Sequence, residues 1–425
     1  SNAALVIENC FDLSVEQLRS IARQFDGKDC LLILTGREVA VDASPSALTM
    51  LGGFDTFSQI TLSRLTESEA QLLSELTDQI AGWRHLPARN AASRQRFIMR
   101  DCQASLPHFL MRLLSSDYVT GRYQEEFSKL SLSEIEKQAI IIALLITHIG
   151  ENAPVSFLSN AMEFDFGAII DDLNRRSGNE AFRLVRRNGQ MIETVPSIGA
   201  QNILRNLFSD SEIVNTVVLL LHNLAGGFRN PFQQFTFNQF MRFSILSTVV
   251  TDRAEIDRFF EHNKRHGQIR RMPLFWLQWH MAKCAAEKFV EAEKLLEQGH
   301  REAEEFERRN GANYDRSHFH VRSAKFLMLR ARKTNREGAE LFRDFKRACD
   351  LTAKVLRHPE PQHYPFVTLK EIVQGFNEIS HRLADVQKPI VEKWITELGK
   401  HARQRFDMLP KGYQSQQART ALQEA

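Results

Sequence analysis

Short apolar runs with polar ends open the chain. Residues 5–7 are Leu-Val-Ile, followed by Glu8 and Asn9, and residues 31–34 are Leu-Leu-Ile-Leu, followed by Thr, Gly and Arg37. Runs of this kind between polar turns are typical of parallel strands that are buried on both faces. The residues between the two runs have apolar side chains at helical spacing, so the pattern predicts a β-α-β unit. Open α/β sheets bind ligands at the carboxyl ends of their strands, which is where these polar residues fall.

Two capped helices are predicted after this unit. Thr66 and Glu69 match a capping box ahead of several leucines at helical spacing. Ser105 is a suitable N-cap for a second helix, because Pro107 is favoured in the first turn. The stretch 82–95 between the two helices is polar and basic, and we expect a loop there.

The next stretch combines three helices with a hairpin. Apolar faces predict helices over 135–146, 155–161 and 166–173. Two β-type runs follow and are joined through Asn188 and Gly189, a dipeptide that is the strongest short signal for a β-hairpin. Three helices followed by a two-stranded wing is the order of a winged-helix domain.

From residue 199 onward the pattern is almost entirely helical. Residues 273–300 have aromatic and small side chains at the spacing of one tetratricopeptide-like hairpin, in which Ala292 lets two antiparallel helices approach closely. The same period does not repeat cleanly. We therefore expect irregular helical pairs, with further helices near 317–333, 336–356, 368–384 and 388–407. The polar tail from residue 410 is expected to be disordered.

Composition excludes several classes of protein. The chain has 425 residues, of which 43% are hydrophobic and 25% charged, enough for about two to four domains of a soluble protein. The net charge of +3 indicates neither a nucleic-acid nor a membrane partner. The longest apolar run, 139–146, is too short to cross a bilayer. The five scattered cysteines form neither a disulfide framework nor a zinc motif, so we expect reduced thiols in a cytoplasmic protein.

Taken in order, these elements resemble the STAND class of P-loop NTPases from the second half of the nucleotide-binding domain onward. The resemblance implies a mainly α protein with a truncated α/β P-loop NTPase remnant, a helical lid, a winged helix and an α-superhelical, tetratricopeptide-like region. The corresponding ranges are 4–62 for the C-terminal part of the α/β nucleotide-binding domain, 63–128 for the helical lid, 129–205 for the winged-helix domain, 206–409 for the helical-repeat-like sensor region and 410–425 for the disordered tail.

The resemblance also implies roles for single residues. Glu8 stands where the family has its Walker B acid, as a catalytic residue and magnesium ligand, and Asn9 lies beside it. Arg37 resembles the sensor arginine, and Pro107 resembles the lid proline that packs near adenine. Asn9, Arg37 and Pro107 would then contact ATP or ADP. Structural roles stay open beside these: a polar strand end for Glu8, a salt bridge for Arg37 and a helix start for Pro107.

The chain departs from the family pattern where phosphate is held. No G-x-x-x-x-G-K-[ST] motif occurs, and phosphoryl transfer depends on that loop, its lysine and the metal ion. We therefore expect ATP or ADP and magnesium in an intact parent protein, and neither a cofactor nor ATP hydrolysis in this chain. Ser105 also replaces the glycine of the lid motif, and residues 195–197 lack a histidine that the family often uses to read the diphosphate. Because a buried-type strand follows the first residues at once, we expect a fragment that starts inside a domain.

These features predict a fragment of a STAND-type ATPase signalling switch, as in bacterial defence or regulation. Its C-terminal helical region would sense a protein partner or a ligand, and the resemblance implies a homo-oligomer that forms when ATP replaces ADP. A non-enzymatic helical scaffold for protein–protein interaction is one alternative. The other is a winged-helix DNA-binding regulator with phosphate contacts from Arg183, Arg186 and Arg187. Two nearby acids, Asp171 and Asp172, would repel phosphate, so nucleic acid is not the partner that we expect.

Two further groups of residues have both a structural and a functional interpretation. His262 and His266 lie at i, i+4 spacing, and His318 and His320 lie two residues apart. Each pair would bind zinc only with further ligands, and capping or solvated histidines are the expected alternative. A cluster of phenylalanines predicts either a core between helices or a partner groove; it comprises Phe232, Phe235, Phe237, Phe240 and Phe243.

Overall fold

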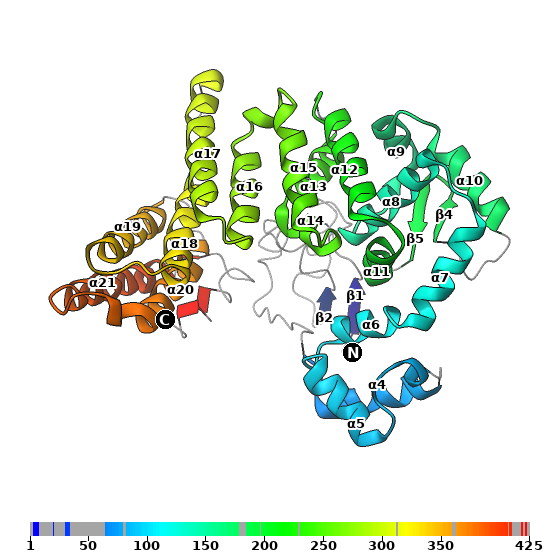
Figure 1. Cartoon of the computed structure of the whole chain (residues 1–425), viewed down its shortest axis with the longest axis horizontal. Coiled ribbons are helices and arrows are strands. Elements are labelled where there is room, and N and C mark those ends of the chain that lie inside the picture. The colour runs from blue at the N-terminus through cyan, green and yellow to red at the C-terminus, as the bar shows by residue number, and fades with distance from the viewer. Residues whose placement is uncertain are drawn as a thin grey trace. The chain divides into compact units, whose positions relative to one another are not determined.

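The computed structural model shows a mainly helical chain (Figure 1). It describes residues 3–7, 20, 30–34, 64–79, 82–177, 184–195, 197–227, 230–311, 313–358, 363–406, 408–409, 418–419 and 421–422. The chain divides into two compact units: residues 60–270 form one, and residues 1–59 together with 271–425 form the other. Among the described helices, none is both long and apolar enough to cross a membrane.

Two parallel strands lie at the start of the chain, as the apolar runs predict. β1 (Ala3–Ile7) pairs with β2 (Cys30–Leu34) in a register that aligns their carboxyl ends. The polar residues predicted to bind nucleotide come shortly after these ends. Glu8 and Asn9 follow β1 and Arg37 follows β2, and all three lie outside the described residues.

Residues 64–129 form a small helical lobe. The Thr66 backbone N–H donates to the Glu69 carboxylate at 2.7 Å, which confirms the capping box. Ser105 caps the predicted second helix, with Pro107 in its first turn. The elements are α4 (Glu67–Gln79), η2 (Gly82–His85), α5 (Ala91–Arg96), the π-helical turn η3 (Phe97–Asp101), α6 (Leu106–Leu114) and α7 (Asp117–Lys129).

The prediction of a loop over residues 82–95 is right only for 86–90, because 82–85 form η2 and α5 begins at Ala91. The stretch also supplies part of the core of the lobe. The rings of Trp83, Phe97 and Phe109 pack at centroid distances of 5.7 to 6.4 Å. The Trp83 indole N–H donates to the Ser74 carbonyl at 2.9 Å. The polar composition of the stretch belongs to its outer face, and a few apolar side chains are enough to bury the inner one.

Three helices and a three-stranded antiparallel sheet follow, with strand order β3-β5-β4. The predicted hairpin is confirmed, and its two loop residues are Gly189 and Gln190. Gly189 has a φ of +59°, the conformation that a type II′ turn needs at its first loop position. Residues 139–147 of the first helix are all buried. The elements are α8 (Glu134–His148), β3 (Ala153–Pro154), α9 (Val155–Met162), α10 (Phe166–Ser177), β4 (Val185–Asn188) and β5 (Met191–Thr194).

Five further helices complete the unit of residues 60–270. The phenylalanine cluster belongs to two of them, and none of its members is exposed. Phe237 and Phe240 are fully buried, and Phe232 packs edge-on against Phe157 at 4.9 Å. The interpretation as a core between helices is therefore right. The helices are α11 (Ser197–Leu207), α12 (Asp210–Leu224), α13 (Pro231–Phe240), α14 (Phe243–Val249) and α15 (Arg253–Arg265).

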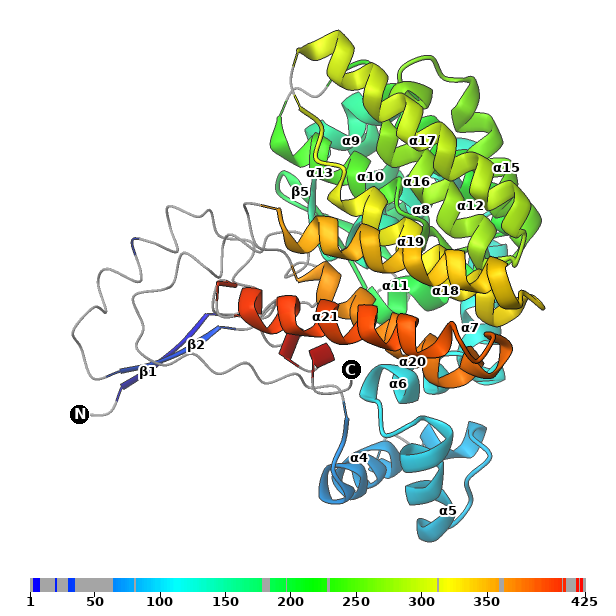
Figure 2. The same ribbon diagram turned by 90° about the vertical axis from the view of Figure 1, so that its left-hand side faces the viewer.

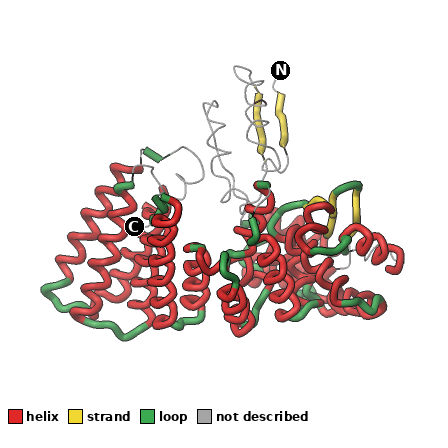
Figure 3. Tube along the Cα trace, turned by 90° about the horizontal axis from the view of Figure 1, so that it is seen from above, coloured by secondary structure: helices red, strands yellow, loops and turns green. Residues whose placement is uncertain are grey.

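Residues 273–406 form a stack of three antiparallel helical pairs, seen side by side in Figure 2 and from above in Figure 3. The pairs are α16 with α17, α18 with α19, and α20 with α21. In addition α17 packs on α18, α18 on α20 and α19 on α21. This stack is the irregular helical array that the sequence predicts. Its elements are α16 (Pro273–Ala285), α17 (Phe289–Asn310), α18 (Ser317–Lys333), α19 (Gly338–Leu356), α20 (Tyr364–Ile379), η6 (Ser380–Arg382) and α21 (Lys388–Phe406), and the short turn η5 (Ile269–Arg271) precedes them.

Small residues set the closest approach between helices in this stack. Ala292 of α17 is fully buried, as its spacing predicts. A Cβ built on Gly299 would lie 2.5 Å from Cε1 of Phe319 and 3.3 Å from Cβ of Trp276. Protein interiors are packed as densely as organic crystals, so the Phe319 ring occupies the room that a side chain at position 299 would need.

Gly299→Ala should therefore destabilise the protein. Overpacking a core costs about 1 to 3 kcal/mol, which outweighs the roughly 1 kcal/mol by which alanine is favoured over glycine in a helix. The Phe319 ring is fully buried and has little freedom to move aside. Chemical denaturation of the whole chain measures the change in the free energy of unfolding.

Gly399→Ala in α21 is the matched control for this substitution. Beyond its chain neighbours and the backbone of its own helix, no atom lies within 4 Å of a Cβ built at that position, so the same change should stabilise the protein by up to about 1 kcal/mol. Equal effects of the two substitutions would show that the contact with Phe319 does not limit the packing of the stack.

Candidate functional site

α18 leaves one partly accessible stripe in the helical stack. Most of its side chains are buried, and it packs on α17, α19 and α20. Five side chains that retain some exposure recur every three or four residues, as expected for one face of a helix. The stripe consists of His318, Arg322, Lys325, Leu329 and Arg332. Three of these are permanent cations, so the face is basic.

Two of the three cations in the stripe pair with acids of α20. Lys325 Nζ lies 2.7 Å from the Glu371 carboxylate. Arg332 donates to the Glu378 carboxylate through Nε and Nη2, at 2.6 and 2.7 Å, which is the fork geometry that arginine prefers. Partly exposed pairs contribute about 0 to 1 kcal/mol each. Their main effect is to align the two helices.

The third cation, Arg322, lacks such a partner. Its guanidinium makes no hydrogen bond or ion pair with any residue that the structure describes. It lies near Cys284, Tyr364 and Glu371, and burial lowers its pKa, although the Glu371 carboxylate opposes that shift. Lys325 already binds Glu371. A charge that is withdrawn from water without a partner is costly, so Arg322 is the strongest candidate for a ligand contact in the stack.

A cysteine and a histidine meet near this face, but they do not form an activated nucleophile. Cys284 Sγ lies 3.5 Å from Nε2 of His280, and Nδ1 of His280 lies 2.9 Å from the Ala292 carbonyl oxygen, to which it donates. Burial raises the pKa of the Cys284 thiol to about 12 and lowers the pKa of His280 to about 4. The nucleophilic form of cysteine is the thiolate. Both groups are therefore neutral near pH 7, and the pair packs α16 against α17.

Three of the four histidines considered as zinc ligands make aromatic contacts. His318 faces Tyr364 of α20 at a centroid distance of 5.0 Å, whereas His320 faces a histidine of α17 at 6.1 Å. His266 packs against His222 at 4.8 Å with the two rings tilted by 32°. Within the described part of the chain, no group of three or more His, Cys, Asp or Glu side chains could hold a metal ion.

Pro107 precedes His108, which lines a recess. Pro107 is exposed in the first turn of α6. Just before this helix, Gln103 and Ala104 both have a φ of +55°, which is uncommon for residues other than glycine and marks a strained turn. α6 packs on α11, and a recess of about 500 Å³ lies there. It is lined by Asp101, Gln103, His108, Met111, Arg112, Ser115 and Arg205, so two guanidinium groups face it against one carboxylate.

The arginines of the β4–β5 hairpin, which the sequence predicts as a wing, are held by neighbouring acids. Arg186 binds Glu193 of the facing strand at 2.6 Å, and Arg187 binds Asp171 of α10 at 3.2 Å. Hydrogen bonds from a neighbouring asparagine and from Arg186 lower the pKa of Glu193, so this acid stays charged beside the arginine. Arg183 lies outside the described residues. These pairings weaken the wing as a phosphate-binding surface.

The chain has a distant structural similarity to a signalling ATPase. It is similar to a signal transduction ATPase with numerous domains (STAND) that has a tetratricopeptide repeat sensor, from Pyrococcus horikoshii, at 11% sequence identity and a TM-score of 0.25, over 99% of this chain and 70% of that one. No protein-family model matches the chain, and no curated protein matches it.

Sequence reasoning missed Arg322. The sequence does contain a signal, because Arg322 falls four residues after His318 and three before Lys325, on the polar stripe of an otherwise apolar helix. The sequence pattern shows which side chains share the stripe, but not which of them form ion pairs. The acids of α20 decide this, and α20 meets α18 only in the folded stack.

Stability should depend on pH through His280. Burial lowers the pKa of this group from 6.5 to about 4, so the native state binds the proton less tightly than the unfolded state does. The contribution of neutral His280 to the free energy of unfolding is complete above about pH 6.5 and is lost as the pH falls toward 4. We expect this group to lower the free energy of unfolding by roughly 3 kcal/mol between pH 7 and pH 4. Denaturant titrations across this range measure the loss.

His280→Gln isolates this contribution. Glutamine does not titrate, and its amide can still donate to the Ala292 carbonyl, so the variant should lose less stability on acidification. His320, whose pKa burial also lowers to about 4, acts in the same direction in both proteins and cancels in the comparison. A variant with a pH profile as steep as that of the unchanged protein would contradict the role of His280.

Proposed function

We propose that this chain is the sensing part of a signalling switch, and that the α18 stripe binds a partner protein through a carboxylate. Arg322 is the observation that supports this most directly. It is a partly buried guanidinium without a hydrogen bond or ion pair among the described residues. Lys325 and Arg332, in the same stripe, already have acids from α20. A carboxylate from a ligand would give Arg322 an ion pair as well.

The surroundings of Arg322 suit an acidic side chain or a free C-terminus. An arginine fork binds a carboxylate through two parallel hydrogen bonds. Tyr364 lies near the guanidinium, and its ring meets that of His318 at 5.0 Å, so aromatic surface is available for the apolar part of a peptide. Because the guanidinium is already partly withdrawn from water, the ligand would bear less of the desolvation cost on binding.

The architecture of the stack supports the same proposal. In stacked helical pairs each pair contacts only its neighbours, and successive helices present a continuous surface to a partner. α18 and α20 pack on each other and are aligned by the Lys325 and Arg332 ion pairs. Arg322 is therefore presented on a rigid face and not on a loop.

The nucleotide part of the proposed switch uses the recess between α6 and α11. In this proposal residues 129–205 are a winged helix, Arg112 and Arg205 face the phosphates of ATP or ADP, and Pro107 lies near the base. Glu8 and Arg37 would contribute to the site only with a phosphate loop and magnesium in an intact parent protein. We therefore propose that this chain does not hydrolyse ATP by itself.

A non-enzymatic helical scaffold is the second candidate function. The observation that favours it is that the Arg322 contact is built entirely from the helical stack and needs no nucleotide. The two functions share the partner contact. They differ in whether a nucleotide changes the affinity for the partner, so a peptide affinity that is unchanged by ADP and ATP in the parent protein would favour the scaffold.

Arg322→Gln should weaken the binding of carboxylate-bearing peptides by about tenfold or more, since it removes a charge-assisted fork from a partly desolvated site. The measurement uses the whole chain and a peptide library synthesised twice, once with acidic residues and a free C-terminus and once with the corresponding amides. Fluorescence anisotropy then compares each acid peptide with its amide twin. We expect affinity for the acid forms only.

Arg332→Gln is the matched control for that substitution. It makes the same charge change in the same stripe, but Glu378 already binds Arg332, so the affinity should change less than about twofold. Thermal unfolding of both variants confirms that the stack is intact. Equal binding of acid and amide peptides, or equal losses from both substitutions, would count against the proposed contact.

A further inference from the structure

The segment of residues 82–112 has six arginines and a single acid, Asp101, and it contains neither lysine nor glutamate. The whole chain is nearly neutral, so this is a strong local excess of one sign. Arginine alone, without lysine, is the composition that suits planar, bidentate contacts with phosphate. None of the sites described above uses η2 or α5, which lie in this segment.

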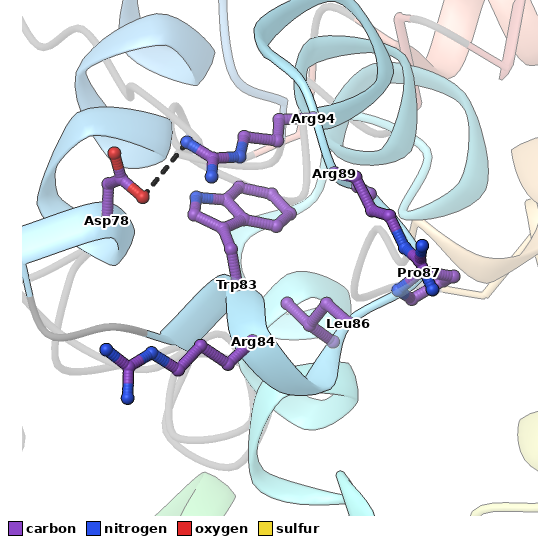
Figure 4. Close-up of a pocket in the computed structure, with 8 residues that line it drawn as sticks. Asp78, Trp83, Arg84, Leu86, Pro87, Arg89 and Arg94 are labelled. Carbon is purple, nitrogen blue, oxygen red and sulfur yellow. Dashed lines mark ion pairs between the residues drawn. The ribbon is translucent and has the colours of Figure 1, made fainter.

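Figure 4 shows a recess of about 430 Å³ built around Trp83. The Arg94 guanidinium lies over the indole ring, 5.3 Å from its centroid, and binds Asp78 at 3.0 Å. Trp83 is 5% exposed and is fixed by its hydrogen bond to the Ser74 carbonyl. Nε of Arg94 is buried and has no hydrogen-bond partner. The floor of the recess is thus held in place by several contacts of Trp83 and Arg94.

Two further arginines line the recess without an acid of their own. Arg84 and Arg89 are both exposed, and neither forms an ion pair or a hydrogen bond with the residues that the structure describes. In Figure 4 they extend on opposite sides of Trp83 and do not converge. Arg96 and Arg100, in the helical segment that follows, are likewise exposed and form no ion pair with described residues.

The spread of these guanidinium groups favours an extended ligand over a compact one. A single phosphate or carboxylate is held by donors that converge on one point, whereas these guanidinium groups are spread over successive elements. A polyanion with regularly spaced charges can meet them in turn, and its binding would release the counterions that it holds. The phosphates of a nucleic-acid backbone have the planar-fork chemistry that arginine recognises.

We propose that the arginine-rich face of residues 82–100, centred on the Trp83 recess, binds the phosphate backbone of a nucleic acid. Arg84 and Arg89 contact phosphates on either side of the recess, and Arg94, bound to Asp78, fixes the floor between them. A contact between guanidinium groups and phosphates does not depend on base sequence. It differs from the wing hypothesis, since the wing arginines are occupied by Glu193 and Asp171.

The test measures the binding of a labelled single strand of about 20 nucleotides, and of its duplex, to the whole chain by anisotropy between about 50 and 200 mM salt. Arg84→Gln combined with Arg89→Gln should weaken binding about tenfold or more at the lowest salt. It should also reduce the slope of log K against log salt by about 1.4 for the single strand or about 1.8 for the duplex, since each phosphate contact contributes about 0.7 or 0.9. Both side chains are exposed and unpaired among the described residues, so folding should be unchanged.

Two double variants serve as matched controls. Arg343→Gln with Arg347→Gln removes two exposed arginines of α19, and Arg186→Gln with Arg187→Gln removes the two of the wing. Both should leave the slope unchanged. Absence of binding at the lowest salt, an equal loss in either control, or full competition by poly-glutamate of equal charge would overturn the proposal; the last outcome would indicate an acidic protein as the partner. Competition by ATP at equal phosphate concentration would overturn it in favour of a compact ligand.

Discussion

The burial of α18 is the constraint on which the helical stack depends. This helix contacts α17, α19 and α20 at once, and Gly299 makes room for its Phe319 ring. Further along, Arg330 binds Glu293 of α17 and Asp344 of α19 at 2.9 and 3.2 Å. Burial raises the pKa of Asp344, and Arg330 opposes that shift. A buried ion pair is costly to break by removing one partner, so the surrounding helices fix α18 and leave a single stripe accessible.

In α18, ion pairs distinguish the cations that stabilise the fold from the cation that a ligand can bind. Arg330 is buried with two acids, and Arg332 is bound by a forked contact to Glu378. Arg322 lies between these extremes, withdrawn from water but without an ion pair among the described residues. A cation in this position costs free energy in the isolated protein and gains most when a partner supplies a carboxylate. Arg322 is thus the candidate ligand contact because the other cations of the stripe already have acids.

The surface of the helical lobe differs from α18, because several of its arginines have no ion pair among the described residues. Its interior is aromatic and closed, with Trp83, Phe97 and Phe109 in mutual contact, whereas the stretch 82–112 alone has six arginines and one acid. Such a local excess of one sign is relieved by a ligand of the opposite sign. The β4–β5 hairpin has a similar cluster in sequence, but Arg186 and Arg187 are paired with acids within the fold. Local composition alone does not distinguish the two surfaces.

Features with a local cause were predictable from the sequence. The capping box at Thr66, the glycine turn of the β4–β5 hairpin, the parallel strands and the helical pairs after residue 273 all follow from spacings of a few residues along the chain. The loop prediction over 82–95 failed where η2 and α5 form, because burial of Trp83 against Phe97 and Phe109 overrides a polar composition there. Only the tertiary structure decided that Lys325 forms an ion pair and Arg322 does not. It likewise decided which arginines remain unpaired among the described residues. An ion pair needs two groups within about 4 Å, and only the packing of helices remote in sequence brings an acid to one cation and leaves its neighbour without one.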